Sequence, residues 1–189
     1  MRDQSEFLAA ATRVGERLVV LRKVLGDTWF CARPVALGEW SVRRAELDFY
    51  DEVPGIALFM AYLARVSGIA DYGRCANESL SFMLRLMADG RCPSRVGLAG
   101  RGGLVYVLSH LSCVLERSDA SDAAKLLVTR TTRHLAEVRD YDVMRGVAGW
   151  LKGAGALYRS TSDSEVFDSV VGSGRLLQRF VGKVANSSS

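Results

Sequence analysis

Three nearly all-apolar segments recur along the chain, and each begins with a glycine. They run from Gly55 to Arg65, from Gly103 to Cys113 and from Gly149 to Arg159. Their leading glycines are 48 and 46 residues apart, a period typical of a helical-pair repeat. A helix that is apolar almost all round must be buried on most sides, so these segments predict inner helices.

Amphipathic segments alternate with the apolar ones and predict outer helices that cover them. Each follows polar residues that suit a helix N-cap, namely Asp71, Ser118-Asp119 and Ser162-Asp163-Ser164. The three outer segments are Tyr72–Ala88, Ala120–Val138 and Glu165–Val184. Inner and outer helices in alternation indicate an α/α toroid or solenoid.

Paired glycines stand at the start of two inner segments. Gly100 and Gly103 form one G-x-x-G motif and Gly146 and Gly149 form another, while Glu52 replaces the first glycine of the first copy. Two glycines one turn apart let another backbone approach closely, and helix packing alone explains them. The inner helices are expected to begin near three residues, Ile56, Leu104 and Trp150.

The segment before the repeats predicts one helix and one hairpin. Residues Glu6 to Leu25 have a helical apolar period, and Thr28–Arg33 and Glu39–Arg44 resemble two strands that form a local flap or lid. The expected fold class is therefore all-α, a partial α/α toroid with a short N-terminal β-hairpin. The expected division of a single domain over 1–189 is a helix at 1–26, the hairpin at 27–46, three helix pairs at 47–184 and a polar tail at 185–189.

Composition places the chain among ordinary globular proteins. It has 189 residues, of which 49% are hydrophobic and 24% charged, which excludes a disordered tail or a collagen-like fibre. The net charge of +4 is scattered, and Arg43-Arg44 is followed at once by Glu46, so no nucleic-acid partner is expected. No apolar run is long enough for a membrane span, and Met1 to Glu6 does not resemble a signal peptide, so a cytoplasmic location is expected.

The cysteines and histidines are isolated from one another. Cys31, Cys75, Cys92 and Cys113 form no close pair, and neither do His110 and His134. Structural zinc sites bring their ligands in close pairs, so no metal or other cofactor is expected on this chain alone. Three cysteines lie in or beside apolar patterns and are expected to be small buried hydrophobes: Cys75, Cys92 and Cys113.

Several motifs in order resemble those of a known family. The first motif is a pair of tryptophans in the hairpin region, Trp29 and Trp40. The second is the run Leu47-Asp48-Phe49-Tyr50-Asp51, which leads into Pro54-Gly55-Ile56-Ala57-Leu58-Phe59. The third is the later run Tyr141-Asp142-Val143-Met144-Arg145-Gly146-Val147-Ala148-Gly149. Together they resemble the lanthionine synthetase cyclases, in particular the C-terminal cyclase domain of class II lanthipeptide synthetases. The resemblance extends from about Phe7 to Val181.

The resemblance implies a toroid of helical hairpins around a zinc ion. It also implies closure of thioether rings, in which a zinc-bound cysteine thiolate of a precursor peptide adds to a dehydrated Ser or Thr. Asp142 matches the active-site aspartate of this family, at the mouth of an inner helix. From the residues alone, Asp142 is a capping carboxylate for that helix, and Asp51 in the first copy is expected to be a cap as well.

The chain also departs from the family pattern. The zinc ligands of the family come from a Trp-Cys and a Cys-His motif in later repeats, and neither occurs in the 40 residues after Gly149. Glu52 and Arg145 stand where the family has small residues, and Lys152 puts a charge into an apolar helix. Lys152 either faces the opening of the toroid or reflects relaxed selection.

These observations favour a truncated or split cyclase fragment that is inactive alone. Its expected partners are the precursor peptide or a missing C-terminal half, and self-association is expected through inner-helix residues without a cover, namely Val105, Leu108, Leu151 and Leu157. The alternative is a non-catalytic helical-repeat module that binds a peptide or a protein. A glycosidase-like toroid enzyme is a third possibility, but it needs paired acids on the inner helices, which are absent.

Overall fold

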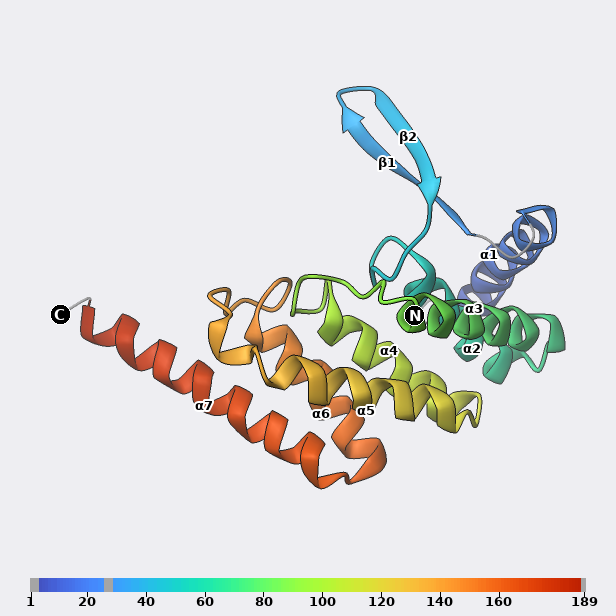
Figure 1. Cartoon of the computed structure of the whole chain (residues 1–189). Coiled ribbons are helices and arrows are strands. Elements are labelled where there is room, and N and C mark those ends of the chain that lie inside the picture. Colours follow the sequence, from blue (N-terminus) through green and yellow to red (C-terminus); the bar gives the residue numbers. More distant parts are fainter. Residues whose placement is uncertain (1–3, 26–28, 188–189) are drawn as a thin grey trace. The chain divides into compact units, whose positions relative to one another are not determined.

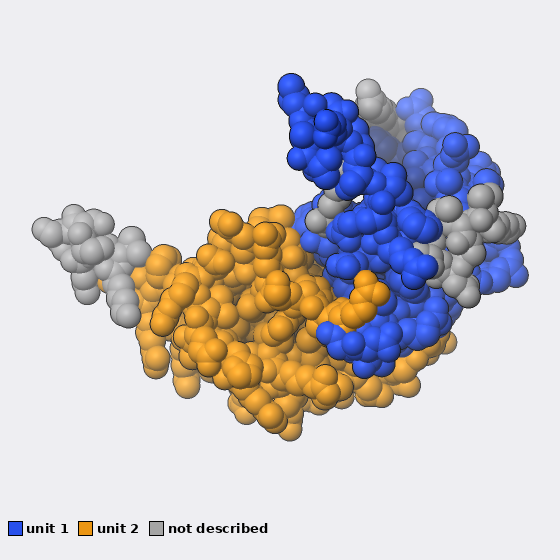
Figure 2. Space-filling view, turned by 45° about the horizontal axis from the view of Figure 1, so that its top comes forward, with its two compact units in different colours: residues 1–90 blue, residues 91–189 orange. Residues whose placement is uncertain are grey.

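The computed structural model describes residues 4–25 and 29–187, and it is mostly helical with one two-stranded antiparallel sheet (Figure 1). The expected all-α class with a short N-terminal hairpin is confirmed. The chain forms two compact units, residues 1–90 and residues 91–189, coloured blue and orange in Figure 2. The single domain expected over 1–189 stays a prediction.

Unit 1 combines the hairpin with helices that pack on one another. Helices α2 and α3 lie against each other, and α1 contacts both. Its elements are α1 (Gln4–Leu25), β1 (Phe30–Ala36), β2 (Glu39–Arg44), α2 (Val53–Ser67) and α3 (Ala70–Ala88).

The hairpin is longer than the sequence predicts. Strand β1 continues past Arg33 to Ala36, and Pro34 lies opposite Trp40 next to an irregularity in the register. A two-stranded sheet has only edge strands, where a residue without an N–H is tolerated. Just before β1, the buried Trp29 donates its indole N–H to Ser79 Oγ of α3 at 3.2 Å, which fixes this end of the hairpin to the helices. The expected first strand residue, Thr28, lies outside the described residues.

Unit 2 has inner helices α4 and α6 and outer helices α5 and α7. Helix α4 packs on α5 and α6, and α6 packs on α7. Trp150 of α6 is fully buried and donates its indole N–H to Ser169 Oγ of α7, which also bonds Thr132 Oγ1 of α5 at 2.7 Å. The elements are α4 (Arg101–Val114), α5 (Ser118–Thr132), the 3₁₀ helix η1 (Leu135–Glu137), α6 (Val147–Thr161) and α7 (Ser164–Ser187).

Each inner helix begins three residues earlier than expected, at Val53, Arg101 and Val147. The first glycine of each pair is itself the N-cap residue, so the second glycine already lies in the first turn. The outer helix expected to reach Val138 ends at Thr132 and is followed by η1. The β-branched residues at the end of α5, which include Thr131 and Thr132, disfavour its continuation.

The expected N-caps are only partly correct. The Asp163 Oδ1 atom accepts the backbone N–H groups of Glu165 and Val166, at 3.0 and 3.2 Å, at the start of α7. By contrast, Asp71 and Asp119 lie inside the first turns of α3 and α5, where they pair with nearby arginines. The N-cap residues of those helices are Ile69 and Arg117, and neither caps through its side chain.

The apolar residues expected to lack a cover are largely buried within this chain. Val105, Leu108 and Leu157 have no exposed surface, so the prediction that they form an exposed apolar patch was wrong. An apolar groove lies instead between α1 and α2, lined by exposed side chains that include Phe7, Leu8, Tyr62 and Val66. Among the described helices, none combines the length and the apolarity that a membrane crossing requires.

Helices α4 and α6 touch backbone to backbone at glycines. A Cβ atom at Gly102 would lie 2.8 Å from Gly149 O and 2.9 Å from Trp150 Cα. A Cβ atom at Gly153 would overlap the carbonyl oxygen of Gly102. Of the paired motif glycines, only Gly149 takes part in this contact, whereas Gly100 and Gly146 lie against their own preceding loops. The other glycines of the contact, Gly102 and Gly153, lie outside the predicted pairs.

We expect Gly153→Ala to destabilise the protein by about 1–3 kcal/mol, because the added methyl group forces α4 and α6 apart. The matched control is Gly172→Ala on α7, where a Cβ atom meets nothing within 4 Å. This control should be neutral or more stable by about 0.5–1 kcal/mol, the usual effect of replacing glycine inside a helix. Urea unfolding of both variants tests the prediction, and equal stability would contradict it.

Candidate functional site

Asp142 lies in the loop that precedes α6, with its side chain 47% exposed. Its Oδ1 atom accepts the backbone N–H groups of Met144 at 2.7 Å and Arg145 at 2.8 Å. The N-cap residue of α6 is Gly146, so Asp142 does not cap the helix as expected. It closes the turn ahead of the helix instead. In the first copy, the N-cap residue of α2 is likewise Glu52 and not Asp51.

The loop of Asp142 is joined to the loop before α4 by three backbone hydrogen bonds. The N–H groups of residues 97, 98 and 99 donate to the carbonyl oxygens of residues 145, 143 and 144, at 2.9, 3.0 and 2.8 Å. Glycine is needed here, because a Cβ atom at Gly97 would lie 2.5 Å from Met144 O and one at Gly149 would lie 2.5 Å from Leu98 N. The Asp142 carboxylate is thus held by a firmly bonded loop.

Hydrogen bonding also sets the ionisation of this carboxylate. The backbone N–H of Arg145, followed by that of Met144, lowers the pKa of Asp142 below its ordinary value. The guanidinium of Arg145 adds to this, with Nε 4.0 Å from Oδ2. Asp142 is therefore ionised at neutral pH.

We expect the carboxyl group of Asp142 to titrate below about 3.9, the usual value for aspartate. A pKa lowered in the folded state contributes stability above the unfolded pKa, and this contribution is lost as the pH falls through the folded pKa. Carboxyl ¹³C NMR during an acid titration measures the midpoint, with Asp142→Asn assigning the signal. A midpoint at or above about 3.9 would show that the two N–H bonds are absent.

Comparison with models of protein families matches residues 44–176 to the lanthionine synthetase C-like proteins. The chain belongs to this family. The match includes Asp142 and all three glycine-led helices, but it excludes α1 and the tryptophans of the hairpin region, Trp29 and Trp40. No curated protein matches the chain.

The zinc ion of lanthionine synthetase cyclases does not fit the donors found here. Within 4–25 and 29–187, no three His, Cys, Asp or Glu side chains come close enough together to hold a metal ion. Cys75 is buried as expected, whereas Cys92 is half-buried in a loop and Cys113 is exposed on α4, against expectation. No step of the chemistry is therefore assigned to a metal on these residues.

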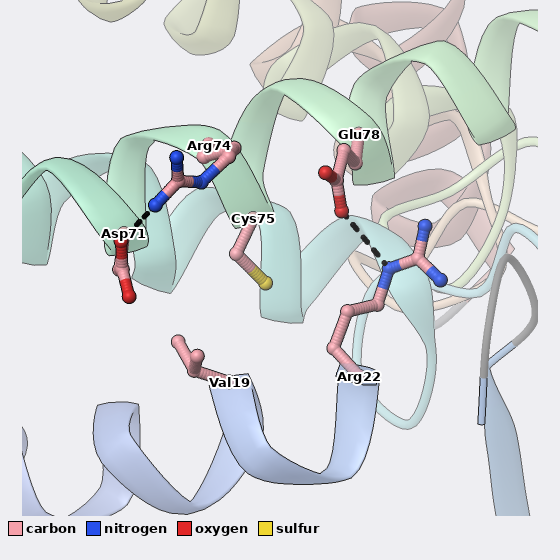
Figure 3. A pocket seen from close by; sticks show the side chains of 6 residues that line it. All are labelled: Val19, Arg22, Asp71, Arg74, Cys75 and Glu78. Carbon is pink, nitrogen blue, oxygen red and sulfur yellow. Dashed lines mark hydrogen bonds and ion pairs between the residues drawn. The ribbon is translucent and has the colours of Figure 1, made fainter. Parts of the chain in front are cut away.

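A small cavity of about 70 Å³ beside Cys75 lies between α1 and α3 (Figure 3). Arg22 of α1 reaches across it, with Nε 3.5 Å from Glu78 Oε2, and Asp71 pairs with Arg74 at the other end. Burial raises the pKa of the Cys75 thiol above its ordinary value. The thiol therefore stays protonated at neutral pH and is a poor nucleophile.

Glu52, a departure from the family pattern, has a structural role that the sequence did not reveal. Its carboxylate is buried and pairs with the guanidinium of Arg43 at the end of the hairpin. It also accepts the backbone N–H groups of Glu46 at 2.5 Å and Asp48 at 3.4 Å. Glu52 thus fastens the loop ahead of α2, where the other copies have a glycine.

Lys152, the other unexpected charge, lies on the exposed surface of α6. Its Nζ atom is 5.8 Å from the ring centre of Tyr106 on α4. The sequence analysis singled out Lys152 but did not group it with the other polar or aromatic side chains of this pair of helices, Tyr106, His110 and Arg159. Their spacing along each helix, four residues on α4 and seven on α6, was the available signal.

Proposed function

We propose that the chain takes part in thioether ring formation in a dehydrated precursor peptide, with Asp142 as its proton-transfer group. In this reaction a cysteine thiol loses its proton, and its sulfur bonds to the β-carbon of a dehydrated Ser or Thr. The electrons of the carbon–carbon double bond move toward the carbonyl group and form an enolate. The enolate then takes up one proton at the α-carbon, so that the protons balance.

The ionised, firmly held carboxylate of Asp142 carries this proposal. Its Oδ1 atom already receives two backbone N–H groups, which leaves Oδ2 as the oxygen for the proton of a substrate thiol. A carboxyl group of low pKa is a strong acid once protonated. It can therefore return the same proton to the enolate carbon.

The proposal extends to the class II type of synthetase, a precursor peptide as substrate and a cytoplasmic location. A free thiol has a pKa of about 8.5, so an unassisted cysteine supplies little thiolate at neutral pH. The described residues offer no metal cluster that could lower this pKa. We therefore propose that ring closure also needs a zinc-carrying cyclase segment, on this or another polypeptide, and that the isolated chain is inactive.

The purified chain is expected to hold no stoichiometric zinc and to close no ring. Elemental analysis measures the zinc. Ring closure is measured by mass spectrometry after thiol alkylation, using a peptide with one cysteine and one dehydroalanine and with zinc supplied. One tightly held zinc per chain, or loss of the alkylatable thiol above the uncatalysed rate, would refute the inactive-fragment proposal.

The role of Asp142 is tested with a separately expressed zinc-carrying segment of a lanthionine synthetase C-like cyclase added to the chain. Asp142→Asn keeps an oxygen that accepts the two N–H groups but cannot transfer a proton, whereas Asp142→Ala loses both properties. Both variants should lower the initial rate by about 10²–10⁴. The control Asp140→Asn, an exposed aspartate of the same loop, should leave the rate unchanged.

A peptide- or protein-binding module without chemistry is the second candidate. It is favoured by the local bonds of Asp142, which by themselves account for an aspartate at this position. In that case Asp142→Asn would behave like the unaltered chain and only Asp142→Ala would be defective. This result would reject the catalytic role.

A further inference from the structure

Four side chains of α4 and α6, two half-buried rings and two exposed cations, form a surface that we call the α4/α6 cationic face: Tyr106, His110, Lys152 and Arg159. The two helices lie side by side, since they touch at Gly102, Gly149 and Gly153 (Figure 1). Tyr106 and His110 are one turn apart on α4, and their rings contact each other with centres 4.4 Å apart and planes tilted by 42°. The face lies within unit 2.

The cations of α6 lie close to these rings. Lys152 reaches across to Tyr106, with 5.8 Å between Nζ and the ring centre. Arg159 folds back along its own helix, because its Nη1 atom lies 3.7 Å from the position of a Cβ atom at Gly155. The guanidinium therefore lies beside the helix next to Gly155.

Among the described residues, no carboxylate neutralises the positive charges of the two exposed cations, Lys152 and Arg159. Burial lowers the pKa of His110 below its ordinary value, and the charges of Arg159 and Lys152 lower it further. At neutral pH the positive charge of the face therefore comes from Lys152 and Arg159, beside the uncharged rings of Tyr106 and His110, and this charge favours an anionic partner.

We propose that the α4/α6 cationic face binds the carboxylate groups of an acidic peptide segment. Lys152 and Arg159 are seven residues apart, which corresponds to roughly 10 Å along a helix. Carboxylates three residues apart on a peptide in the polyproline II conformation lie on the same face, separated by roughly 9 Å. Arg159 offers a planar fork that matches a carboxylate, Lys152 a point charge, and Tyr106 an apolar surface for the peptide between them.

This inference relies on the proposed function only for the partner class, a peptide. It assigns a binding surface away from the hydrogen bonds of Asp142 and involves no ring closure. Asp142→Asn should therefore leave peptide binding unchanged. Loss of ring closure with intact binding, or the reverse, separates failure of one proposal from failure of the other.

The probe is a short blocked peptide with two glutamates three residues apart, titrated into the full chain at low ionic strength and followed by NMR. We expect saturable binding that weakens as salt is added, and no binding of the same peptide with glutamines. The double variant K152A/R159A should weaken the Kd about fivefold to tenfold, the range for two exposed charge pairs. K152R/R159K keeps both charges and should retain most of the affinity.

The matched control removes two other exposed cations, Arg175 and Arg179 of α7, and changes the net charge by the same amount. R175A/R179A should bind the glutamate peptide like the unaltered chain. Equal binding by K152A/R159A, or equal loss in the control, would overturn the assignment of the site. Tighter binding of inorganic phosphate or of a single-stranded oligothymidylate than of the glutamate peptide would overturn the choice of partner.

Discussion

The contact between the backbones of α4 and α6 is the constraint on which unit 2 depends. Gly102, Gly149 and Gly153 bring the two inner helices closer than any side chain would allow. This closeness lets the loop ahead of α4 donate three backbone hydrogen bonds to the loop ahead of α6, which fix the turn of Asp142. The same contact places the rings of α4 next to the cations of α6. A methyl group at one of these glycines would thus disturb both surfaces that we assign to function.

The loops that precede the inner helices are held in two different ways in the two units. In unit 2, the N-cap glycines Gly100 and Gly146 lie against backbone carbonyl groups of their own preceding loops. In unit 1, the carboxylate of Glu52 accepts hydrogen bonds from backbone N–H groups of the preceding loop and pairs with the guanidinium of Arg43. A buried carboxylate is tolerated because it is bonded on several sides, and removal of one partner from such a group is costly. The loss of a glycine is therefore compensated and does not mean a looser helix start.

The two proposed functional surfaces differ in their physical basis. Asp142 relies on geometry, because its loop is bonded on both sides and its ionisation follows from two N–H donors. The α4/α6 cationic face relies on charge, since flexible side chains gather where no described carboxylate balances them. A proton-transfer group needs a fixed position relative to the reacting atoms, whereas recognition of an acidic segment tolerates movement.

The sequence by itself determined the helical class and the family, because the apolar period and short ordered motifs are local properties of the chain. It also pointed to Asp142, through motifs that lie within a few residues of one another. Only the tertiary structure decided what each residue does there. Asp142 closes a turn through its own neighbours, and Glu52 is buried against Arg43 at the end of the hairpin. Val105 and Leu108 are covered because α4 packs on α5 and α6, which follow it in the sequence. The grouping of Tyr106 and His110 with Lys152 and Arg159 arises from two helices whose starts lie 46 residues apart, and their approach is set by the glycines between them.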